Sequence, residues 1–259
     1  LCSMPPDELA THFRLHGPIT KKNISAHVRL IRAAISFLGD TGLRRAEATN
    51  AKRTDLKLST LRLGQWELTT VGKRNKERTV PVSKRVVELL QAHWEDRGLD
   101  FRYGMETRPL LAPIALPLTE SSKRRHFDEE GEPVDPGFAV SGLGRLVSRA
   151  MTEIADDKLN PYLDDDERNR LRVAAAHALR HTNGTLLASL SMPLDVVQRR
   201  LGHESLQTTT IYVQAEEQRV LDESSRIEQL LGEMTVKLDA QPSAPLIAGV
   251  ALDRVLELV

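Results

Sequence analysis

The chain has 259 residues, and its 36 Lys and Arg balance 36 Asp and Glu, so its formal net charge is zero. A single cysteine, Cys2, excludes an intramolecular disulfide framework and a cysteine-rich zinc site. The longest apolar stretch, 244–252, is far below the roughly 20 residues that a membrane span requires. We therefore expect a soluble, cytoplasmic protein that does not bind membranes.

The charges are segregated along the chain. Between Thr41 and Arg85 there are 12 basic and four acidic residues, whereas between His126 and Glu167 there are three basic and 12 acidic residues. This separation indicates one surface for a polyanion and another that faces solvent or protein. Two ordinary solvated surfaces would give the same counts, so charge alone leaves both interpretations open.

Hydrophobic periodicity predicts the elements of the first hundred residues. Apolar residues repeat at helical spacing from Ile24 to Leu38, and Gly42 follows as a stop signal. A second, short helix is predicted over Arg44 to Lys52, and a third over Val86 to His93. Between them we predict three strands, the last two joined by a turn at 72–76: Leu56–Leu63, Gln65–Val71 and Thr79–Val82.

The rest of the chain is predicted to be helical apart from one insertion. Residues 98–144 contain five prolines and are predicted to be irregular, with partial disorder around 129–136. Further helices are predicted at 143–154, 168–190, 194–201 and 205–212, with a polar helix to Leu231. Pro193 and Gly202 bound the third of these. We therefore predict an α+β fold, mainly α-helical, with a small three-stranded antiparallel sheet.

Residues that could perform chemistry occur in five short segments. Their side chains are arginines, a lysine, histidines and one tyrosine, which together offer positive charge, proton transfer and a hydroxyl nucleophile. The segments are Thr41-Gly42-Leu43-Arg44-Arg45-Ala46-Glu47, Gly72-Lys73-Arg74-Asn75-Lys76-Glu77-Arg78, His177-Ala178-Leu179-Arg180-His181-Thr182, Leu201-Gly202-His203 and Thr208-Thr209-Thr210-Ile211-Tyr212.

This set of side chains suits attack on a phosphodiester. Guanidinium groups match the phosphate oxygens bidentately and remain charged at any working pH. A tyrosine hydroxyl, with a pKa near 10, needs a base and nearby cations before it becomes a good nucleophile. Histidine can accept that proton, and lysine can protonate the leaving oxygen. Fixed cations then take the electrostatic role of magnesium, so we expect no metal and no cofactor.

The same motifs resemble those of the tyrosine recombinase (phage integrase) family, in the family's order over 41–212. A single H-x-x-R is weak evidence, whereas four motifs in register are specific. The matching motifs are His177-x-x-Arg180, Leu201-Gly202-His203 followed nine residues later by Tyr212, the first arginine box at 41–47 and the lysine-bearing hairpin at 72–81.

The resemblance implies a role for each matching residue. Tyr212 is expected to attack the scissile phosphate and form a 3′-phosphotyrosyl bond. Lys73 is expected to protonate the leaving 5′ oxygen, and His177 to handle the tyrosine proton. The residues expected to hold the phosphate are Arg44, Arg180 and His203, with Glu47 bracing the arginine site from behind. Four further basic residues are expected to contact DNA: Arg45, Arg74, Lys76 and Arg78.

The resemblance also implies a domain organisation and partners. The segments expected are an N-terminal linker (1–20), a catalytic domain (21–234) that carries the insertion at 98–144, and a C-terminal tail (235–259). The partners expected are double-stranded DNA, with four protomers acting on two duplexes, and accessory DNA-bending proteins. Such an enzyme would be prokaryotic and associated with the nucleoid. The N-terminal DNA-clamping domain of the family is missing from this stretch of sequence.

Several residues have an alternative interpretation. Lys76 competes with Lys73 for the hairpin role, and His181 is expected to be structural. His177 and His181 have the i,i+4 spacing of a zinc helix, but Ala178 stands where the general-base glutamate would be. The acidic run 164–167 is interpreted as the start of a helix and not as a magnesium site, because adjacent helical residues point in different directions.

Three rival functions remain at this point. A type IB topoisomerase would use the same chemistry without sequence preference, a DNA-binding regulator would use the scaffold alone, and a metallohydrolase would use His177 and His181. Two features depart from the family: Arg74 replaces the usual glycine of the hairpin turn, and an Ala-rich run replaces the short loop before His177.

Overall fold

A computed structural model describes residues 23–102, 107–116, 119–157, 162–202 and 225. Contacts between residues divide the chain into two units, 1–212 and 213–259, and the structure describes Ser225 of the second, in a helical conformation. All elements named below belong to the first unit. The predicted boundaries of the linker and the tail fall outside the described residues and stay predictions.

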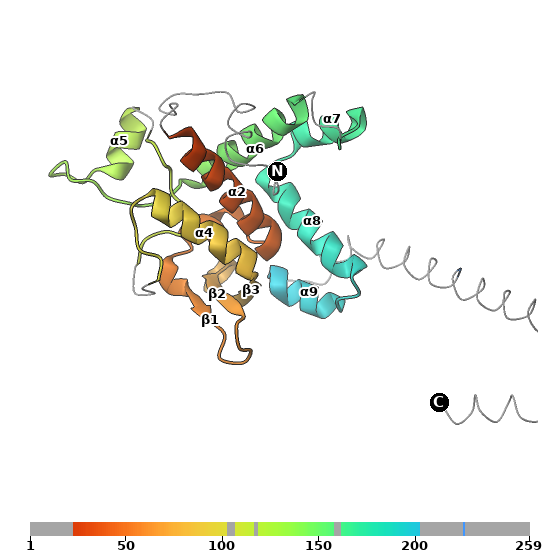
Figure 1. Cartoon of the computed structure of the whole chain (residues 1–259). Coiled ribbons are helices and arrows are strands. Elements are labelled where there is room, and N and C mark those ends of the chain that lie inside the picture. The colour runs from red at the N-terminus through yellow and green to blue at the C-terminus, as the bar shows by residue number, and fades with distance from the viewer. Residues whose placement is uncertain (1–22, 103–106, 117–118, 158–161, 203–224, 226–259) are drawn as a thin grey trace, which may run out of the picture. The chain divides into compact units, whose positions relative to one another are not determined.

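The first unit is mainly α-helical and carries a small sheet, as Figure 1 shows. In chain order, its described elements are α2 (Ile24–Thr41), α3 (Arg45–Asn50), η1 (Arg53–Asp55), β1 (Leu56–Leu58), β2 (Trp66–Val71), η2 (Lys73–Asn75), β3 (Glu77–Val82), α4 (Lys84–Asp96), α5 (Glu120–His126), α6 (Val140–Asp156), α7 (Asp165–Val173), α8 (Ala176–Ser189) and α9 (Leu194–Leu201).

Helix α2 runs through the core of this unit. Its Ala33, Ala34 and Phe37 are completely buried, and α4 and α8 lie along opposite sides of it in Figure 1. The helix ends where predicted, because Gly42 adopts a left-handed conformation (φ 64°) and its N–H donates to the Leu38 carbonyl. The prediction of this helix from its apolar spacing is confirmed.

The three predicted strands form one antiparallel sheet in the order β1-β2-β3. Leu56 pairs with Leu68, and Leu68 pairs with Val80, so these three buried side chains line one face of the sheet and set its register. Strand β1 is shorter than predicted because the chain turns back, with the Ser59 N–H donating to the Gln65 carbonyl. The sheet brings the η2 turn to one end of β2 and β3.

The single helix predicted over 168–190 is wrong. Ala174 and Ala175 are extended and separate α7 from α8, although alanine favours helix intrinsically. The two helices have different environments, since α7 buries none of its residues whereas α8 begins with the buried Ala176. Tertiary packing therefore overrides local propensity here, and a break precedes His177.

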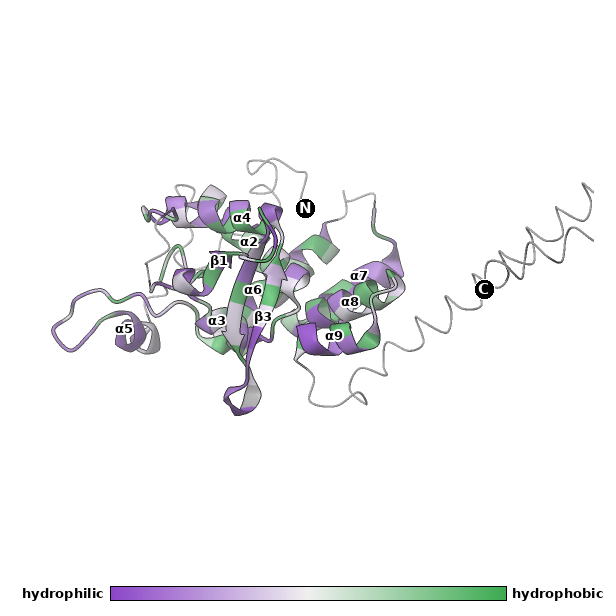
Figure 2. Ribbon diagram, turned by 90° about the horizontal axis from the view of Figure 1, so that it is seen from below, coloured by the Kyte–Doolittle hydropathy of each residue, from purple (hydrophilic) through white to green (hydrophobic). Residues whose placement is uncertain are grey.

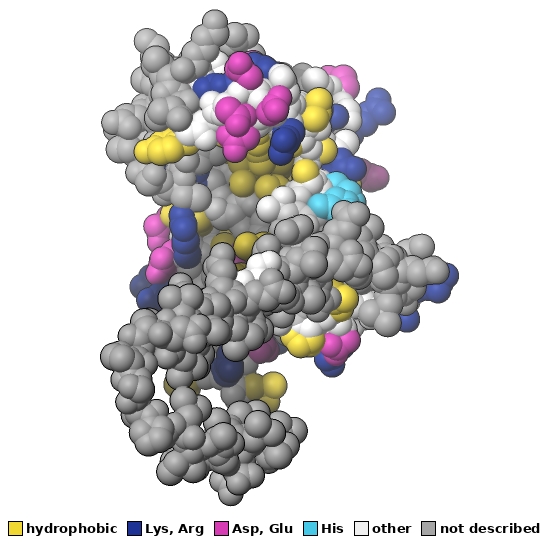
Figure 3. All heavy atoms as spheres, turned by 90° about the vertical axis from the view of Figure 1, so that its right-hand side faces the viewer, with side chains coloured by type: hydrophobic (Ala, Val, Ile, Leu, Met, Phe, Trp, Pro, Cys, Tyr) yellow, Lys and Arg dark blue, Asp and Glu magenta, His cyan; other side chains and the backbone are white. Residues whose placement is uncertain are grey.

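The acidic run begins α7, as predicted. The Asp164 carboxylate accepts from the Glu167 N–H at 2.7 Å, and Glu167 accepts from the Asp164 N–H at 3.0 Å, which is a reciprocal capping box. Figure 3 shows acidic side chains gathered near the top of the face that it views, with basic side chains beside them.

The insertion at 98–144, predicted to be irregular, contains helix α5 and the start of α6, and it is partly packed. Leu110 and Leu111 are completely buried, and the Leu110 carbonyl accepts from the Trp94 indole at 3.2 Å. The segment 129–136, for which we expected partial disorder, forms a turn closed by backbone bonds between 126 and 134 and between 128 and 132. Buried apolar side chains therefore hold part of a segment in place, although its proline content predicted an irregular, partly disordered conformation.

Amphipathic surfaces cover this core. Figure 2 shows α8 and α9 as mixtures of hydrophobic and hydrophilic residues, in keeping with helices that have one face against the protein. No helix among the described residues has the length and apolar character that crossing a bilayer requires.

Helix α4 buries a histidine in this core. Burial, and to a smaller extent the nearby Arg97, lower the pKa of His93 to about 3 against the opposing effects of Asp96 and the Ala112 backbone. The His93 Nε2 accepts from the Ala112 N–H at 3.3 Å, so the ring is neutral and joins α4 to the insertion. The unfolded chain takes up this proton near pH 6.5, whereas the folded chain does not.

We predict that His93 makes the protein less stable in mild acid. Below pH 6.5 the unfolded state binds one more proton than the folded state, so the free energy of unfolding should fall by up to roughly 1.4 kcal/mol per pH unit. Urea unfolding between pH 6.5 and 5, followed by tryptophan fluorescence, measures this slope. His93→Gln keeps an acceptor for the Ala112 N–H and should flatten the slope; an unchanged slope in that variant would contradict the assignment.

Candidate active site

The site is built where the C-terminal ends of α2 and α9 meet. Both helices end in a left-handed glycine, Gly42 and Gly202. The Arg180 guanidinium, which is only 3% exposed, joins the two ends: it donates to the Gly42 carbonyl and to the Leu201 carbonyl, both at 2.6 Å. Terminal helix carbonyls carry partial negative charge and therefore favour a cation at this point.

Two further side chains complete this junction. The Asn183 amide donates to the Gly39 and Asp40 carbonyls at 2.8 and 3.0 Å, and Arg200 donates to the Asp40 carbonyl at 2.6 Å. Asn183 lies three residues after Arg180 on α8, so both side chains point from one face of that helix. The end of α2 thus receives donors from both α8 and α9.

Arg44 reaches the same junction from the start of α3. Its Nη2 donates to the Gly202 carbonyl at 2.9 Å, and its Nη1 pairs with Glu47 Oε1 at 2.9 Å. The carbonyls bound by Arg44 and Arg180 belong to consecutive residues, so the two guanidinium groups converge. Arg44 uses two of its five N–H groups in these bonds, and its side chain is 37% exposed.

Glu47 is a buried carboxylate held between two arginines. Burial alone would raise the pKa of Glu47, but the hydrogen bonds from Arg78 and from the Arg44 backbone lower it overall. Arg78 binds it bidentately, with both nitrogen–oxygen distances at 2.8 Å. The predicted bracing position of Glu47, behind Arg44, is the position that the structure gives it; its catalytic role stays a prediction.

His177 is exposed in the first turn of α8. Partial burial lowers the pKa of His177, and the neighbouring His181 and Arg180 lower it further, as do Arg45 and Arg44. Its ring lies edge-on to that of His181, with centroids 4.4 Å apart. A neutral imidazole near pH 7 can accept a proton, which is the form that a general base requires.

The hairpin turn η2 lies beside Glu47. A Cβ added to Gly72 would lie 3.2 Å from Glu47 Oε1, so the backbone directly before Lys73 packs closely on the carboxylate. Arg74 and Asn75 both have positive φ (60° and 59°), so Arg74 adopts the backbone conformation that a glycine would adopt more easily. Lys73 begins this turn, but its side chain lies outside what the structure describes.

A hollow of about 670 Å³ opens beside the arginines. Its lining is strongly basic and comes from the hairpin, β3 and α9. The residues are Arg44, Gly72, Lys76, Glu77, Arg78, Thr79, Pro81, Met192, Val196, Arg199, Arg200 and Gly202. Lys76 therefore lines this hollow, and its predicted contact with DNA stays a prediction.

The other predicted residues are placed differently. The Arg78 guanidinium is only 13% exposed and binds Glu47 and the Arg200 carbonyl at the edge of the hollow; its contact with DNA stays a prediction. Arg45 is exposed and approaches Gly144 of α6. His203 and Tyr212 lie outside the described residues, so their positions stay predictions.

Sequence reasoning missed three contributors to this site. Asn183 and Arg200 were not selected, and Gly42 was interpreted only as a helix stop. The one available signal was spacing, since Asn183 follows Arg180 by three residues on the same helix. In the described part of the chain, no three His, Cys, Asp or Glu side chains form a group that could hold a metal.

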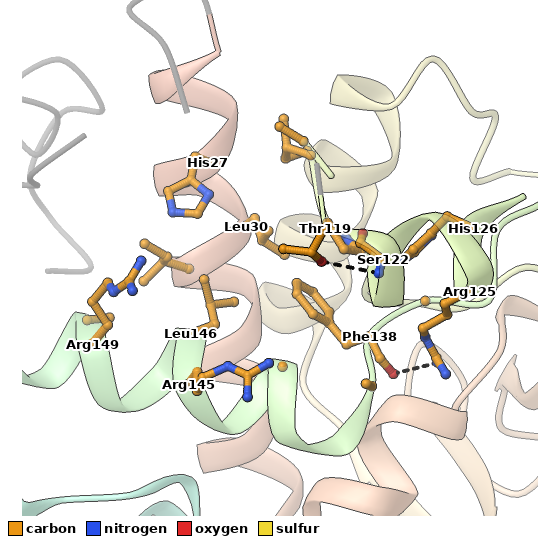
Figure 4. Close-up of a pocket in the computed structure, with 18 of the residues that line it drawn as sticks. His27, Leu30, Thr119, Ser122, Arg125, His126, Phe138, Arg145, Leu146 and Arg149 are labelled. Atoms are coloured by element: carbon orange, nitrogen blue, oxygen red, sulfur yellow. Dashed lines mark hydrogen bonds between the residues drawn. The ribbon is translucent and has the colours of Figure 1, made fainter. Parts of the chain in front are cut away.

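A second cavity lies away from these residues, between α2, α5 and α6. It has a volume of about 360 Å³, and Figure 4 shows Leu30, Leu146 and Phe138 around it. Arg145 and Arg149 stand on its α6 side, near His27 of α2. None of the predicted site residues lines it, so it is separate from the arginine junction.

Comparison with known proteins matches this arrangement to one family. Residues 145–219 match the phage integrase family. The chain is 28% identical over 225 residues to tyrosine recombinase XerC 2 of Ralstonia nicotianae, covering 86% of this chain and 54% of that protein. It is 30% identical over 191 residues to tyrosine recombinase XerC of Bradyrhizobium diazoefficiens, covering 73% and 47%. The chain therefore spans about half the length of these relatives.

Solved structures show the same fold. The XerH site-specific recombinase bound to palindromic difH substrate, in a post-cleavage complex, gives a TM-score of 0.52 at 23% identity and covers 85% of this chain and 50% of that one. The pre-cleavage complex of XerH with difH gives 0.50 at 23% identity, with coverages of 80% and 46%. The predicted fold class, a mainly helical recombinase-like domain with a three-stranded sheet, is confirmed.

We predict that Gly42 is required by contact as well as by conformation. A Cβ at this position would lie 2.6 Å from Leu201 Cδ2 and 2.8 Å from Asn183 Oδ1. Gly42→Ala should therefore lower the free energy of unfolding by roughly 2–4 kcal/mol. Gly98→Ala is the matched control, because Gly98 also has positive φ (70°) but no atom within 4 Å of the added Cβ. It should cost only about 1 kcal/mol; equal losses in urea unfolding would contradict the close approach.

Proposed function

We propose that this chain cleaves and rejoins DNA at specific sites, because it belongs to the phage integrase family of tyrosine recombinases. The observation that carries the proposal is the convergence of Arg44 and Arg180 on the consecutive carbonyls of Gly202 and Leu201. Arg44 lines the basic hollow and Arg180 lies buried directly behind the end of α9, so the pair fits one phosphate group, whose two non-bridging oxygens need two donors.

The proposed reaction is a transfer of the phosphoryl group from a DNA oxygen to a tyrosine oxygen. The Tyr212 oxygen attacks the scissile phosphorus, the bond from phosphorus to the 5′ oxygen breaks, and a 3′-phosphotyrosyl bond remains. His177 takes the phenolic proton, and the lowered pKa that keeps its ring neutral supports this role. Lys73 gives a proton to the leaving 5′ oxygen, so the charges balance.

Arg44 and Arg180 stabilise the charge that develops on the phosphate oxygens. Removing one preorganised donor of this kind typically lowers the rate about 100- to 1,000-fold. His203, which directly follows Gly202, donates to the same phosphate, and Glu47 holds Arg44 in place. The covalent adduct conserves the energy of the broken bond, so rejoining needs neither ATP nor a metal ion.

The surfaces around the site support double-stranded DNA as the partner. Lys76 and Arg199 line the hollow beside Arg44, whereas no residue of the acidic start of α7 lines it. Arg45 and Arg74 are also exposed. We propose that four protomers act together on two duplexes in the cytoplasm of a prokaryotic cell, at the nucleoid.

A covalent trapping experiment tests this function. The protein is incubated with a pool of DNA duplexes whose core sequence is randomised. Each duplex carries a nick beside one candidate scissile phosphate, so that cleavage releases a short strand and the DNA cannot be rejoined. We expect an SDS-stable protein–DNA adduct that enriches one core sequence, persists in EDTA and disappears in Tyr212→Phe. Tyr162→Phe, which changes an exposed tyrosine, is the matched control and should react like wild type.

Three outcomes would contradict the proposal. Wild-type protein that shifts DNA in a gel but forms no adduct is a binding regulator. An adduct without any core preference, together with relaxation of supercoiled plasmid, indicates a type IB topoisomerase. Loss of DNA cleavage in EDTA indicates a metal-dependent hydrolase.

A further inference from the structure

Arg78 connects three segments that carry proposed catalytic residues. It is the second residue of β3, and its guanidinium binds both oxygens of Glu47 on α3 at 2.8 Å. Its Nε donates to the Arg200 carbonyl, in the last turn of α9, at 3.1 Å. One planar side chain thus holds the lysine hairpin against the helix after Arg44 and against the helix before His203.

Two glycines leave the space that this guanidinium fills. A Cβ added to Gly202 would lie 2.9 Å from both Cζ and Nη1 of Arg78, and one added to Gly72 would lie 3.1 Å from Nη1. Gly72 directly precedes Lys73, and Gly202 directly precedes His203. The Arg78 guanidinium is therefore enclosed between the backbone positions from which both residues emerge.

We propose that Arg78 is a positioning residue that fixes the hairpin carrying Lys73 against the arginine site; this inference rests on the function proposed above. Arg44 keeps its bonds to Glu47 and Gly202 without Arg78, because neither involves that residue. The hairpin, in contrast, loses three hydrogen bonds to α3 and α9 when Arg78 is removed. Removing Arg78 should therefore impair proton donation to the leaving oxygen more than it impairs stabilisation of the phosphate by Arg44 and Arg180.

Geometry explains why this residue is an arginine. Only a planar fork can bind both carboxylate oxygens and also present Nε to a third acceptor, whereas a lysine offers a single point of charge. A catalytic group misplaced by about 1 Å can cost on the order of 100-fold in rate. Arg78→Lys should therefore be defective even though it preserves the charge beside Glu47.

A change of leaving group tests the proposal. In a 5′-bridging phosphorothiolate, sulfur replaces the leaving 5′ oxygen, and a thiolate leaves without a proton because thiols have a pKa of about 8.5. We expect Arg78→Gln and Arg78→Lys to cleave the ordinary substrate roughly 100-fold more slowly than wild type. On the sulfur substrate both should recover most of that loss, as should Lys73→Ala.

The matched control is a similar ion pair far from the site. Arg29 of α2 binds Asp96 of α4 bidentately, at 2.8 Å from Nε and 2.6 Å from Nη2. Arg29→Gln should lower the melting temperature but leave the cleavage rate of folded protein unchanged on both substrates. If Arg78→Gln does not fold, Arg78→Lys provides the same comparison, since it keeps a cation beside the buried carboxylate.

The outcomes separate this inference from the function on which it rests. A wild-type rate in folded Arg78→Lys and Arg78→Gln, or an equal loss on oxygen and sulfur substrates, would overturn the positioning role while leaving the recombinase function in place. Wild-type protein that forms no Tyr212 adduct with either substrate would overturn the function itself, and the inference with it.

Discussion

The arrangement of the site depends on the capping of two helix ends by one buried guanidinium. Arg180 of α8 donates to Gly42 at the end of α2 and to Leu201 at the end of α9. The carbonyls at a helix C-terminus have no partners within the helix and carry partial negative charge, so they both need donors and favour cations. Because the two ends share one donor, the segments that follow them, which begin at Leu43 and His203, start from neighbouring points.

This constraint explains how a neutral chain presents a cationic site. Arg78 also binds the carbonyl of Arg200 in α9, Arg44 binds that of Gly202 directly after it, and the two share the carboxylate of Glu47. Each guanidinium is thus fixed by protein acceptors, which preorganises it before any substrate binds. Electrostatic stabilisation of a transition state is most effective when the charges need no reorganisation. The acidic residues that balance the total charge lie elsewhere, as at the start of α7.

Local patterns predicted the elements of this fold, because each pattern is recorded in neighbouring residues. The apolar spacing of α2, its stop at Gly42 and the bounds of α9 between Pro193 and Gly202 are of this kind. The break at Ala174 and Ala175 could not be predicted, because alanine has a high helix propensity and only the burial of Ala176 explains the interruption.

Motif spacing identified the arginines of the site but not their supports. Asn183 and Arg200 bind backbone carbonyls more than 140 positions away in the chain, and backbone acceptors leave no mark on the sequence. Arg78 illustrates the same limit. Its place in a basic hairpin predicts a DNA contact, but gives no sign that its guanidinium also binds Glu47 and the end of α9.

The central claim is that Arg44 and Arg180 act on one phosphate, and a substrate of altered charge tests it directly. A methylphosphonate at the scissile position replaces one charged oxygen by a methyl group, so less charge remains for the arginines to stabilise. Measured on an ordinary phosphate, Arg44→Ala and Arg180→Ala should each lower the cleavage rate by about 100-fold or more. On the methylphosphonate both losses should shrink at least tenfold. An undiminished loss in either variant would mean that its arginine does not face the scissile phosphate.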